Sequence, residues 1–311
     1  MILRDRPSGL RLFVTMRGSV LSQIWKSLLV TTVLAIIVTM THGALLHHKI
    51  ILTTIPFTLM GLPLAIFLGF RNNSAYDRYW EGRKLWGDLV LRSRNFARQC
   101  TSLTGPGTAG EGEAADVQVR MIYRAIGFAH ALRHQLRGSN SAADLKPLLP
   151  EQEWLRTTMA SHQPHFLMER MGEDLRLCLD QGRIDSVLMA SLDATMSGMV
   201  AAAAACERIR NTPIPFSYTL LLHRTAYLYC FLLPFGLVDS IGYMTPLVVS
   251  IVAYTFFGLD ALGDEIEEPF GTSANDLPLD AICRGIEINL RESLMEKNIP
   301  PPSKPVNYQL S

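Results

Sequence analysis

Residues 51–86 read ILTTIPFTLMGLPLAIFLGFRNNSAYDRYWEGRKLW, and this stretch decides the fold. It begins as a hydrophobic span and changes at Arg71 into a charged segment rich in aromatic residues. No charged side chain occurs between Lys49 and Arg71, which is close to the roughly 20 residues that a helix needs to cross a bilayer. The stretch therefore predicts a transmembrane helix that continues into water beyond Arg71.

One side of this predicted helix carries a narrow stripe of bulky apolar side chains. At about 100° per residue, the stripe contains Ile55, Leu59, Leu62, Ile66 and Phe70. A ridge of small residues beside it contains Gly61, Ala65 and Gly69. Small residues let membrane helices approach closely, and an apolar stripe repeated in a ring of helices suits a hydrophobic channel gate. An ordinary packed membrane helix explains the same pattern, because apolar stripes at helical spacing are usually core.

Hydrophobic residues make up 48% of the 311 residues and are strongly segregated along the chain. They predict four membrane spans, at residues 24–46, 50–70, 218–237 and 243–262. Basic residues flank these spans on one side, at Arg4, Arg6, Arg11, Arg17 and Lys26, then Arg71, Arg78, Arg83 and Lys84, then Arg208 and Arg210. The first link carries only Lys49, so both termini and the long middle segment are expected in the cytoplasm. The first span is long enough to cross, and no cleavable signal peptide is expected.

This topology divides the chain into five parts. We expect a cytosolic N-terminal segment (1–23), a transmembrane hairpin (24–70), a cytosolic helical domain (71–212), a second hairpin (213–262), and a cytosolic C-terminal helix with a Pro-rich tail (263–311). Helical patterns outside the membrane occur at 71–103, 117–135, 145–159, 165–179, 186–210 and 279–297, with a loop at 104–116. No long strand pattern and no internal repeat is present.

Motifs for chemistry are almost absent. The sequence has no Walker loop, dinucleotide-binding glycine motif, zinc-protease motif or nucleophile elbow. We therefore expect no catalytic residue, no metal site and no cofactor. A net charge of +1 gives no indication of nucleic-acid binding. Reduced structural thiols are predicted for the scattered cysteines, which are Cys100, Cys178, Cys206, Cys230 and Cys283.

Three polar groups leave alternatives open. His47 and His48 in the first link favour a polar loop over a weak metal site. His223 and Arg224 favour anchoring near a helix end over a polar conduit. An acidic cluster follows the fourth span and favours a solvated face over a cation site. It consists of Asp264, Glu265, Glu267 and Glu268.

Several motifs resemble the bestrophin family of ion channels, in its prokaryotic branch. The runs FRNNSAYDRYWEGRKLWG at 70–87 and CERIRNTPIPFSYTLLLHR at 206–224 look especially like bacterial members. Shorter matches, in the family's order and spacing, are Arg17-Gly18-Ser19, Pro63, residues 68–70, Arg78, Trp80, and Glu268-Pro269-Phe270-Gly271, which resembles the family's NPFG. The resemblance covers most of the chain, and the motifs are specific as a set.

The resemblance implies an all-α membrane protein that forms a homopentameric ring around one axial pore. The second helix of each subunit would line a narrow hydrophobic neck at Leu62, Ile66 and Phe70. A wide cytosolic vestibule would follow the neck. A second constriction, the aperture, would fall within residues 187–191, with Leu188 as the expected residue.

The chain departs from the animal members of this family in two places. They carry Phe at the middle neck position, where this chain has Ile66. They also follow NPFG with an acidic run that holds Ca²⁺, whereas residues 272–276 contain a single carboxylate, Asp276. Because Ca²⁺ sites need several anionic oxygens, we expect conduction that does not require a Ca²⁺ clasp.

We therefore expect a pentameric channel for monovalent ions in a bacterial inner membrane, with lipid and further copies of the chain as its partners. Bacterial relatives are associated with Na⁺, and the stripe continues to Asn73 and Asp77, where a ring of carboxylates would concentrate cations. Asp77 could instead pair with a neighbouring arginine. Na⁺ and K⁺ are the expected ions, and a chloride channel of the same architecture is the alternative. A membrane transporter or membrane-bound enzyme is the alternative from another class, disfavoured by the missing inverted repeats and catalytic motifs.

Overall fold

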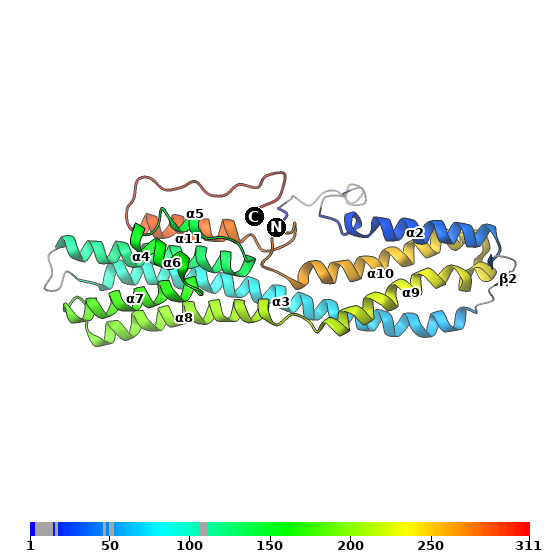
Figure 1. The fold of residues 1–311 in the computed structure, drawn as a ribbon, viewed down its shortest axis with the longest axis horizontal. Coiled ribbons are helices and arrows are strands. Elements are labelled where there is room, and N and C mark those ends of the chain that lie inside the picture. The colour runs from blue at the N-terminus through cyan, green and yellow to red at the C-terminus, as the bar shows by residue number, and fades with distance from the viewer. Residues whose placement is uncertain (4–14, 16–17, 46–47, 50–52, 106–110) are drawn as a thin grey trace. The chain divides into compact units, whose positions relative to one another are not determined.

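The fold is almost entirely helical, as the computed structural model in Figure 1 shows. The structure describes residues 1–3, 15, 18–45, 48–49, 53–105 and 111–311. The long helices are α2 (Leu21–Met40), α3 (Thr54–Leu103), α4 (Glu111–Arg137), α7 (Gln163–Asp180), α8 (Ser186–Asn211), α9 (Phe216–Ile241), α10 (Thr245–Glu267) and α11 (Leu279–Ser293). The short elements are α5 (Ala142–Leu145), α6 (Glu151–Met159), the 3-10 turn η1 (Gly242–Met244), and strands β1 (Ala44–Leu45) and β2 (His48–Lys49), which pair antiparallel.

The chain forms two compact units. The first, called the apolar unit, consists of Arg4–Tyr79 and Pro213–Glu268. The second, called the polar unit, consists of Met1–Leu3, Trp80–Thr212 and Pro269–Ser311. Helix α3 contributes residues to both units.

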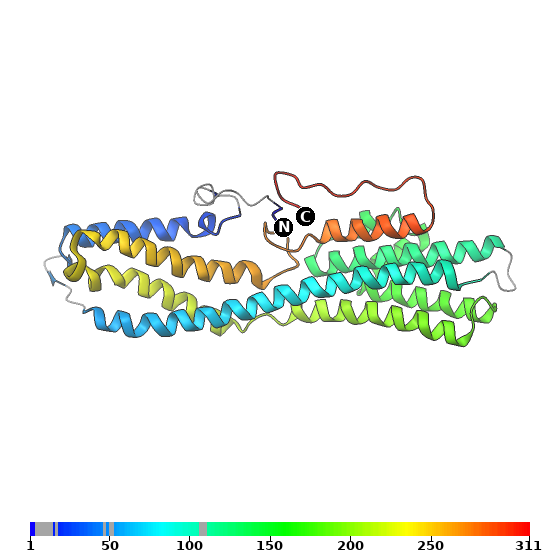
Figure 2. The same ribbon diagram turned by 180° about the vertical axis from the view of Figure 1, so that it is seen from behind.

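Helices α2, α9, α10 and the first part of α3 form the apolar unit. Small residues let α2 and α10 pack closely, since Ala35 and Ala253 are both fully buried. Aromatic rings fill the space between α9 and α10, where Tyr227 stacks on Phe257 with centroids 4.3 Å apart. Figure 2 shows these helices from behind, with α2 and α10 side by side.

Helix α4 is central to the polar unit and packs against α7 and α11. Ion pairs link α4 to its neighbours. Arg124 pairs with Asp174 and Glu153, and Arg137 donates to Asp280 at 2.7 Å. All five cysteines are buried and unpaired, an arrangement expected of structural cysteines.

Four helical stretches are long and apolar enough to cross a membrane, at Leu21–Met40, Thr54–Leu103, Ser186–Asn211 and Phe216–Glu267. Three of them overlap the four predicted spans, because the last stretch runs through α9, η1 and α10. The fourth is α8, which the sequence placed outside the membrane. Its apolar character comes largely from alanine, and one face packs on α7 and α4 of the polar unit.

Two local predictions were wrong. A single helix at 145–159 is replaced by α5 and α6, because Pro147 and Pro150 interrupt the pattern. The predicted loop at 104–116 is shorter, since α4 already begins at Glu111. Helix α3 runs through Pro63 as one continuous helix of 50 residues, as the prediction of a transmembrane helix that continues beyond Arg71 requires. Arg4, Arg6, Arg11, Arg17 and His47 lie outside the described residues.

Candidate functional site

The first part of α3 has two faces of different character. One face is buried in the apolar unit, where Leu64 and Leu68 pack against Leu222 and Ala226 of α9. Arg71 and Ala75 continue this buried face, and each has an exposed fraction of 0%. The other face carries the predicted stripe. Within the single chain, α3 is therefore packed on one face, and its other face is open.

The three expected neck residues all lie on the open face. Leu62 is 67% exposed, Ile66 is 47% exposed and Phe70 is 57% exposed in the single chain. Ile55 and Leu59 of the same stripe are also exposed. A contiguous row of open apolar side chains of this kind indicates lipid, further protein or a pore beside it. The chain's own core therefore does not cover the stripe, and the two explanations from sequence, a channel gate and an ordinary packed membrane helix, both stay predictions.

The ridge of small residues beside the stripe has two different ends. Gly61 accommodates the side chain of Tyr229, because a Cβ at this position would lie 2.9 Å from the Tyr229 hydroxyl oxygen. No atom lies within 4 Å of the corresponding point at Gly69. The ridge therefore serves packing within the chain at Gly61 and leaves a free surface at Gly69.

The open face continues past Phe70. Asn73 and Asp77, the two candidate vestibule residues, are both exposed. Their position follows from helical spacing, which brings residues three and four apart onto one side. The sequence prediction that Asn73 and Asp77 extend the stripe therefore agrees with their exposure.

A buried ion-pair network on the opposite face was missed by the sequence analysis. The guanidinium of Arg71 donates from Nη1 to Asp260 Oδ1 at 2.8 Å and from Nη2 to Asp264. The same Nη2 lies 3.7 Å from Glu267 Oε2. The three carboxylates are on one face of α10, since they are three or four residues apart.

Two sequence interpretations need correction in the light of this network. The acidic cluster after the fourth span was interpreted as a solvated face, yet Asp264 and Glu267 surround a buried guanidinium. Glu267 also accepts from the Ile214 main-chain N–H at 3.0 Å. His223 was interpreted as a helix-end anchor, but its Nδ1 lies 2.6 Å from Asp260 Oδ2. A buried Arg at the end of a membrane span requires carboxylate partners. The position of Arg71 at the end of the predicted span was therefore the sequence signal that could have indicated the network.

The expected aperture residue lies in the polar unit, in the first turn of α8. Leu188 is half-buried, and its main-chain N–H donates to the capping carboxylate of Asp185 at 2.8 Å. Val187 beside it is 75% exposed. Both residues lie in the first turn of α8, and Asp185 fixes where this helix begins, because Asp is a strong N-cap residue. The identity of the aperture residue stays a prediction.

The segment that follows Glu268-Pro269-Phe270-Gly271 forms a compact turn. Asp276 is buried, and its Oδ2 accepts from the Ser273 main-chain N–H at 2.7 Å. The only carboxylate in residues 272–276 is thus engaged by the chain itself. Among the residues that the structure describes, no group of three or more His, Cys, Asp or Glu side chains could hold a metal ion.

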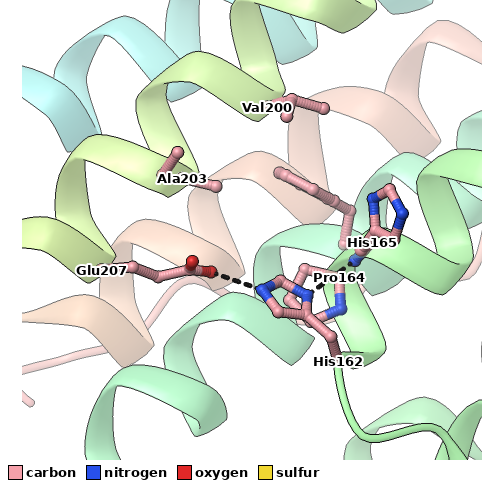
Figure 3. A pocket seen from close by; sticks show the side chains of 8 residues that line it. His162, Pro164, His165, Val200, Ala203 and Glu207 are labelled. Carbon is pink, nitrogen blue, oxygen red and sulfur yellow. Dashed lines mark hydrogen bonds and ion pairs between the residues drawn. The ribbon is translucent and has the colours of Figure 1, made fainter.

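A small cavity of about 160 Å³ lies among α4, α7 and α8 of the polar unit. Figure 3 shows His162 beside it, between Glu207 and the start of α7. His162 Nδ1 accepts from the His165 N–H at 3.2 Å, and His162 Nε2 lies 2.9 Å from Glu207 Oε1. Because both ring nitrogens are engaged, we interpret His162 as the cap of α7.

Comparisons with known proteins agree on one family. The model of the bacterial and fungal bestrophin family matches residues 1–292. YneE of Salmonella typhi, named a voltage-dependent anion channel-forming protein, is 43% identical over 315 residues, and the match covers 100% of both chains. A voltage-dependent anion channel-forming protein of Mesorhizobium japonicum is 44% identical over 297 residues, 95% of this chain and 93% of that protein.

A solved structure supports the same relationship. The crystal structure of a bacterial bestrophin homologue from Klebsiella pneumoniae matches with a TM-score of 0.83 and 36% sequence identity. The match covers 88% of this chain and 100% of that chain.

Proposed function

The chain belongs to the bacterial and fungal bestrophin family of ion channels, and from this premise we propose that it forms a membrane pore for monovalent anions, lined by the open stripe of α3. The observation that carries the proposal is the contrast between the two faces of this helix. Arg71 and Leu68 are fully buried, whereas Leu62, Ile66 and Phe70 are open.

A single copy of the stripe cannot enclose a pore. We therefore infer a ring of identical chains, a homopentamer as the family resemblance implies, in which the five α3 helices face one axis. Leu62, Ile66 and Phe70 would form successive rings about 6 Å apart along that axis, because four residues of helix rise by that distance. Apolar rings of this kind control flux by width and by dewetting.

The names of the relatives favour anions. Proteins from Salmonella typhi and Mesorhizobium japonicum carry the description of anion channels. The preference for Na⁺ and K⁺ that the sequence suggested has no support from these names, and the chloride alternative fits them better. One observation favours cations as a second candidate, which is the exposed carboxylate of Asp77 beyond the neck.

The topology belongs to the same proposal. The apolar unit would lie in the inner membrane of a bacterium, with both termini and the polar unit on the cytoplasmic side. The basic residues around the spans support this orientation. Helix α8 would then be a helix of the cytosolic domain, with Leu188 near its start as the aperture. The proposal keeps the predicted domain boundaries, with the cytosolic helical domain beginning at residue 71 and the second transmembrane hairpin beginning at residue 213.

A recording from purified protein in planar bilayers under asymmetric NaCl tests the function. A reversal potential near the equilibrium potential of Cl⁻ supports the anion pore. A value near the equilibrium potential of Na⁺ would replace it with the cation pore, and the absence of unitary currents would contradict both. Native mass measurement in detergent tests the ring, and a monomer that still conducts would exclude it.

A further inference from the structure

The ion-pair network of Arg71 lies directly after the last expected neck residue. We propose that Arg71, held by Asp260 and Asp264, is a positioning residue that fixes the rotation of α3 about its axis and thereby sets the width of the neck at Phe70. The proposal rests on the proposed function, in which the open face of α3 lines the pore.

The angular relationship on α3 supports this role. At about 100° per residue, Arg71 lies roughly 140° around the helix from the middle of the stripe. A contact that holds Arg71 against α10 therefore holds Leu62 and Ile66 on nearly the opposite side of the helix, and Phe70 on the side about 100° away. A rotation of about 20° would move a side chain that is about 6 Å from the helix axis by about 2 Å. Five simultaneous shifts of this size would change the bore of a narrow ring substantially.

The network joins three helices at one point. Asp260 Oδ1 accepts from Arg71 of α3, while Asp260 Oδ2 lies 2.6 Å from His223 Nδ1 of α9. The carboxylate itself belongs to α10, and its main-chain oxygen also lies 3.3 Å from Arg71 Nη1. One carboxylate therefore ties the rotation of α3 to both neighbouring helices.

Further polar contacts extend the same attachment along α3. Asn72 Nδ2 donates to the Leu259 main-chain oxygen at 3.0 Å, and Arg78 Nε donates to the Glu267 main-chain oxygen at 3.0 Å. Gly263 leaves the space for this approach, because a Cβ there would lie 3.4 Å from Arg71 Cζ and would overlap Asn72 Oδ1. The attachment is directional, unlike the apolar contacts of Leu64 and Leu68, which tolerate sliding.

Asp264→Asn is the decisive variant. Removing the buried guanidinium or Asp260 endangers folding, since it leaves an uncompensated charge, whereas the Asp264 side chain is 55% exposed. We expect the assembled variant to conduct with a unitary conductance raised at least about two-fold, because a loosened α3 turns its rings off the pore axis. Glu268→Gln is the matched control, an exposed carboxylate four residues further on that lies outside the network, and its conductance should match that of the parent.

Testing Asp264→Asn in a second parent protein distinguishes an effect on the position of α3 from a direct electrostatic effect of the lost charge. In the variant with Leu62, Ile66 and Phe70 all replaced by Ala, Asp264→Asn should no longer change the conductance, since the side chains through which it acts are gone. The same fold-change in both backgrounds would show a direct effect of the lost charge and overturn the proposal, as would an unchanged conductance of Asp264→Asn in the parent. An unchanged conductance of the triple-alanine background itself would instead contradict the pore assignment of the stripe.

Discussion

The phenyl ring of Phe57 in α3 lies directly over Gly236 in α9, in the space that a Cβ at position 236 would occupy. Phe57 is buried among Ala35, Leu233 and Val249, so its ring has little room to move. The absence of a side chain at Gly236 is therefore a condition for the close approach of these two helices.

Gly236→Ala should destabilise the protein. Alanine favours a helix over glycine by about 1 kcal/mol, but overpacking against a buried ring costs about 1–3 kcal/mol, and the overlap with Phe57 makes the loss prevail. The midpoint of thermal unfolding in detergent should fall. Gly285→Ala in α11 is the control, because nothing lies within 4 Å of its Cβ position, and it should stabilise the protein by up to about 1 kcal/mol. Equal midpoints for the two variants would contradict the packing argument.

Replacing Leu62, Ile66 and Phe70 together by Ala should raise the unitary conductance at least about two-fold, because a wider and wetter constriction offers less resistance. Single-channel recording in symmetric salt measures this effect. Leu221→Ala is the matched control, since Leu221 is an equally exposed leucine on α9. A conductance that rises in the control and not in the triple variant would place the pore on a different face.

Asp77→Asn should move the reversal potential toward the equilibrium potential of Cl⁻. Carboxylates near a pore mouth raise the local concentration of cations, and their removal lowers it. Recordings under asymmetric NaCl measure the shift, with Asp180→Asn, an exposed carboxylate of α7 that pairs with Arg176, as the control. A reversal potential that is the same in parent and Asp77→Asn would remove Asp77 from the ion pathway.

Current should persist when Ca²⁺ is chelated with EGTA. The reason is that Asp276 is the only carboxylate of residues 272–276 and is engaged by Ser273 N–H, whereas Ca²⁺ takes six or more oxygen ligands. Bilayer currents before and after chelation, and after Ca²⁺ is restored, test this expectation. Loss of current with recovery on adding Ca²⁺ would contradict it.

Glu287 makes the stability of the polar unit depend on pH. This buried carboxylate accepts from Arg284 at 2.6 Å and Arg291 at 3.1 Å, and His130 faces it at 3.6 Å. Burial raises the pKa of Glu287, but His130 and Arg284 lower it by more, so that the pKa lies below its ordinary value. A lowered pKa means stabilisation that is present above the unfolded value of about 4.3 and lost as the pH falls through the folded value.

Glu287→Gln should therefore lower the free energy of unfolding by about 2 kcal/mol at neutral pH, because Gln cannot replace the charge-assisted hydrogen bonds to Arg284 and Arg291. The difference from the parent should shrink as the pH falls below about 4. Denaturant unfolding at several pH values measures both effects. Glu292→Gln, an exposed glutamate of the same helix, should show neither. A difference independent of pH would point to lost packing rather than lost charge.

Long helices with clear ends were predictable from local pattern. The interval 186–210 was predicted for α8 and the helix spans Ser186–Asn211, because the Asp185 cap and the prolines after Asn211 mark both ends. The open stripe was equally visible, since helical periodicity places Leu62, Ile66 and Phe70 on one side.

The Arg71 network could not be predicted in the same way. Arg71 and Asp260 are 189 residues apart in sequence, and no local pattern reports a contact between α3 and α10. Charge placement led to Arg71 being counted only as a basic residue that sets orientation. The acidic cluster was likewise interpreted as a solvated face, because its partner Arg71 is distant in sequence and nothing close to the cluster in sequence indicates the contact.

The burial of all five native cysteines has a practical consequence for chemical probing. Burial raises the pKa of Cys206 and of Cys283 to about 12 and also raises the pKa of Cys178. Since the thiolate is the reacting form, a pKa raised from 9.0 to about 12 reduces the thiolate fraction roughly a thousand-fold at neutral pH. The parent chain is thus a nearly silent background for thiol reagents. Single cysteines introduced at positions 62, 66, 70 and 77 could be modified one at a time, and their rates would map which side of α3 meets water.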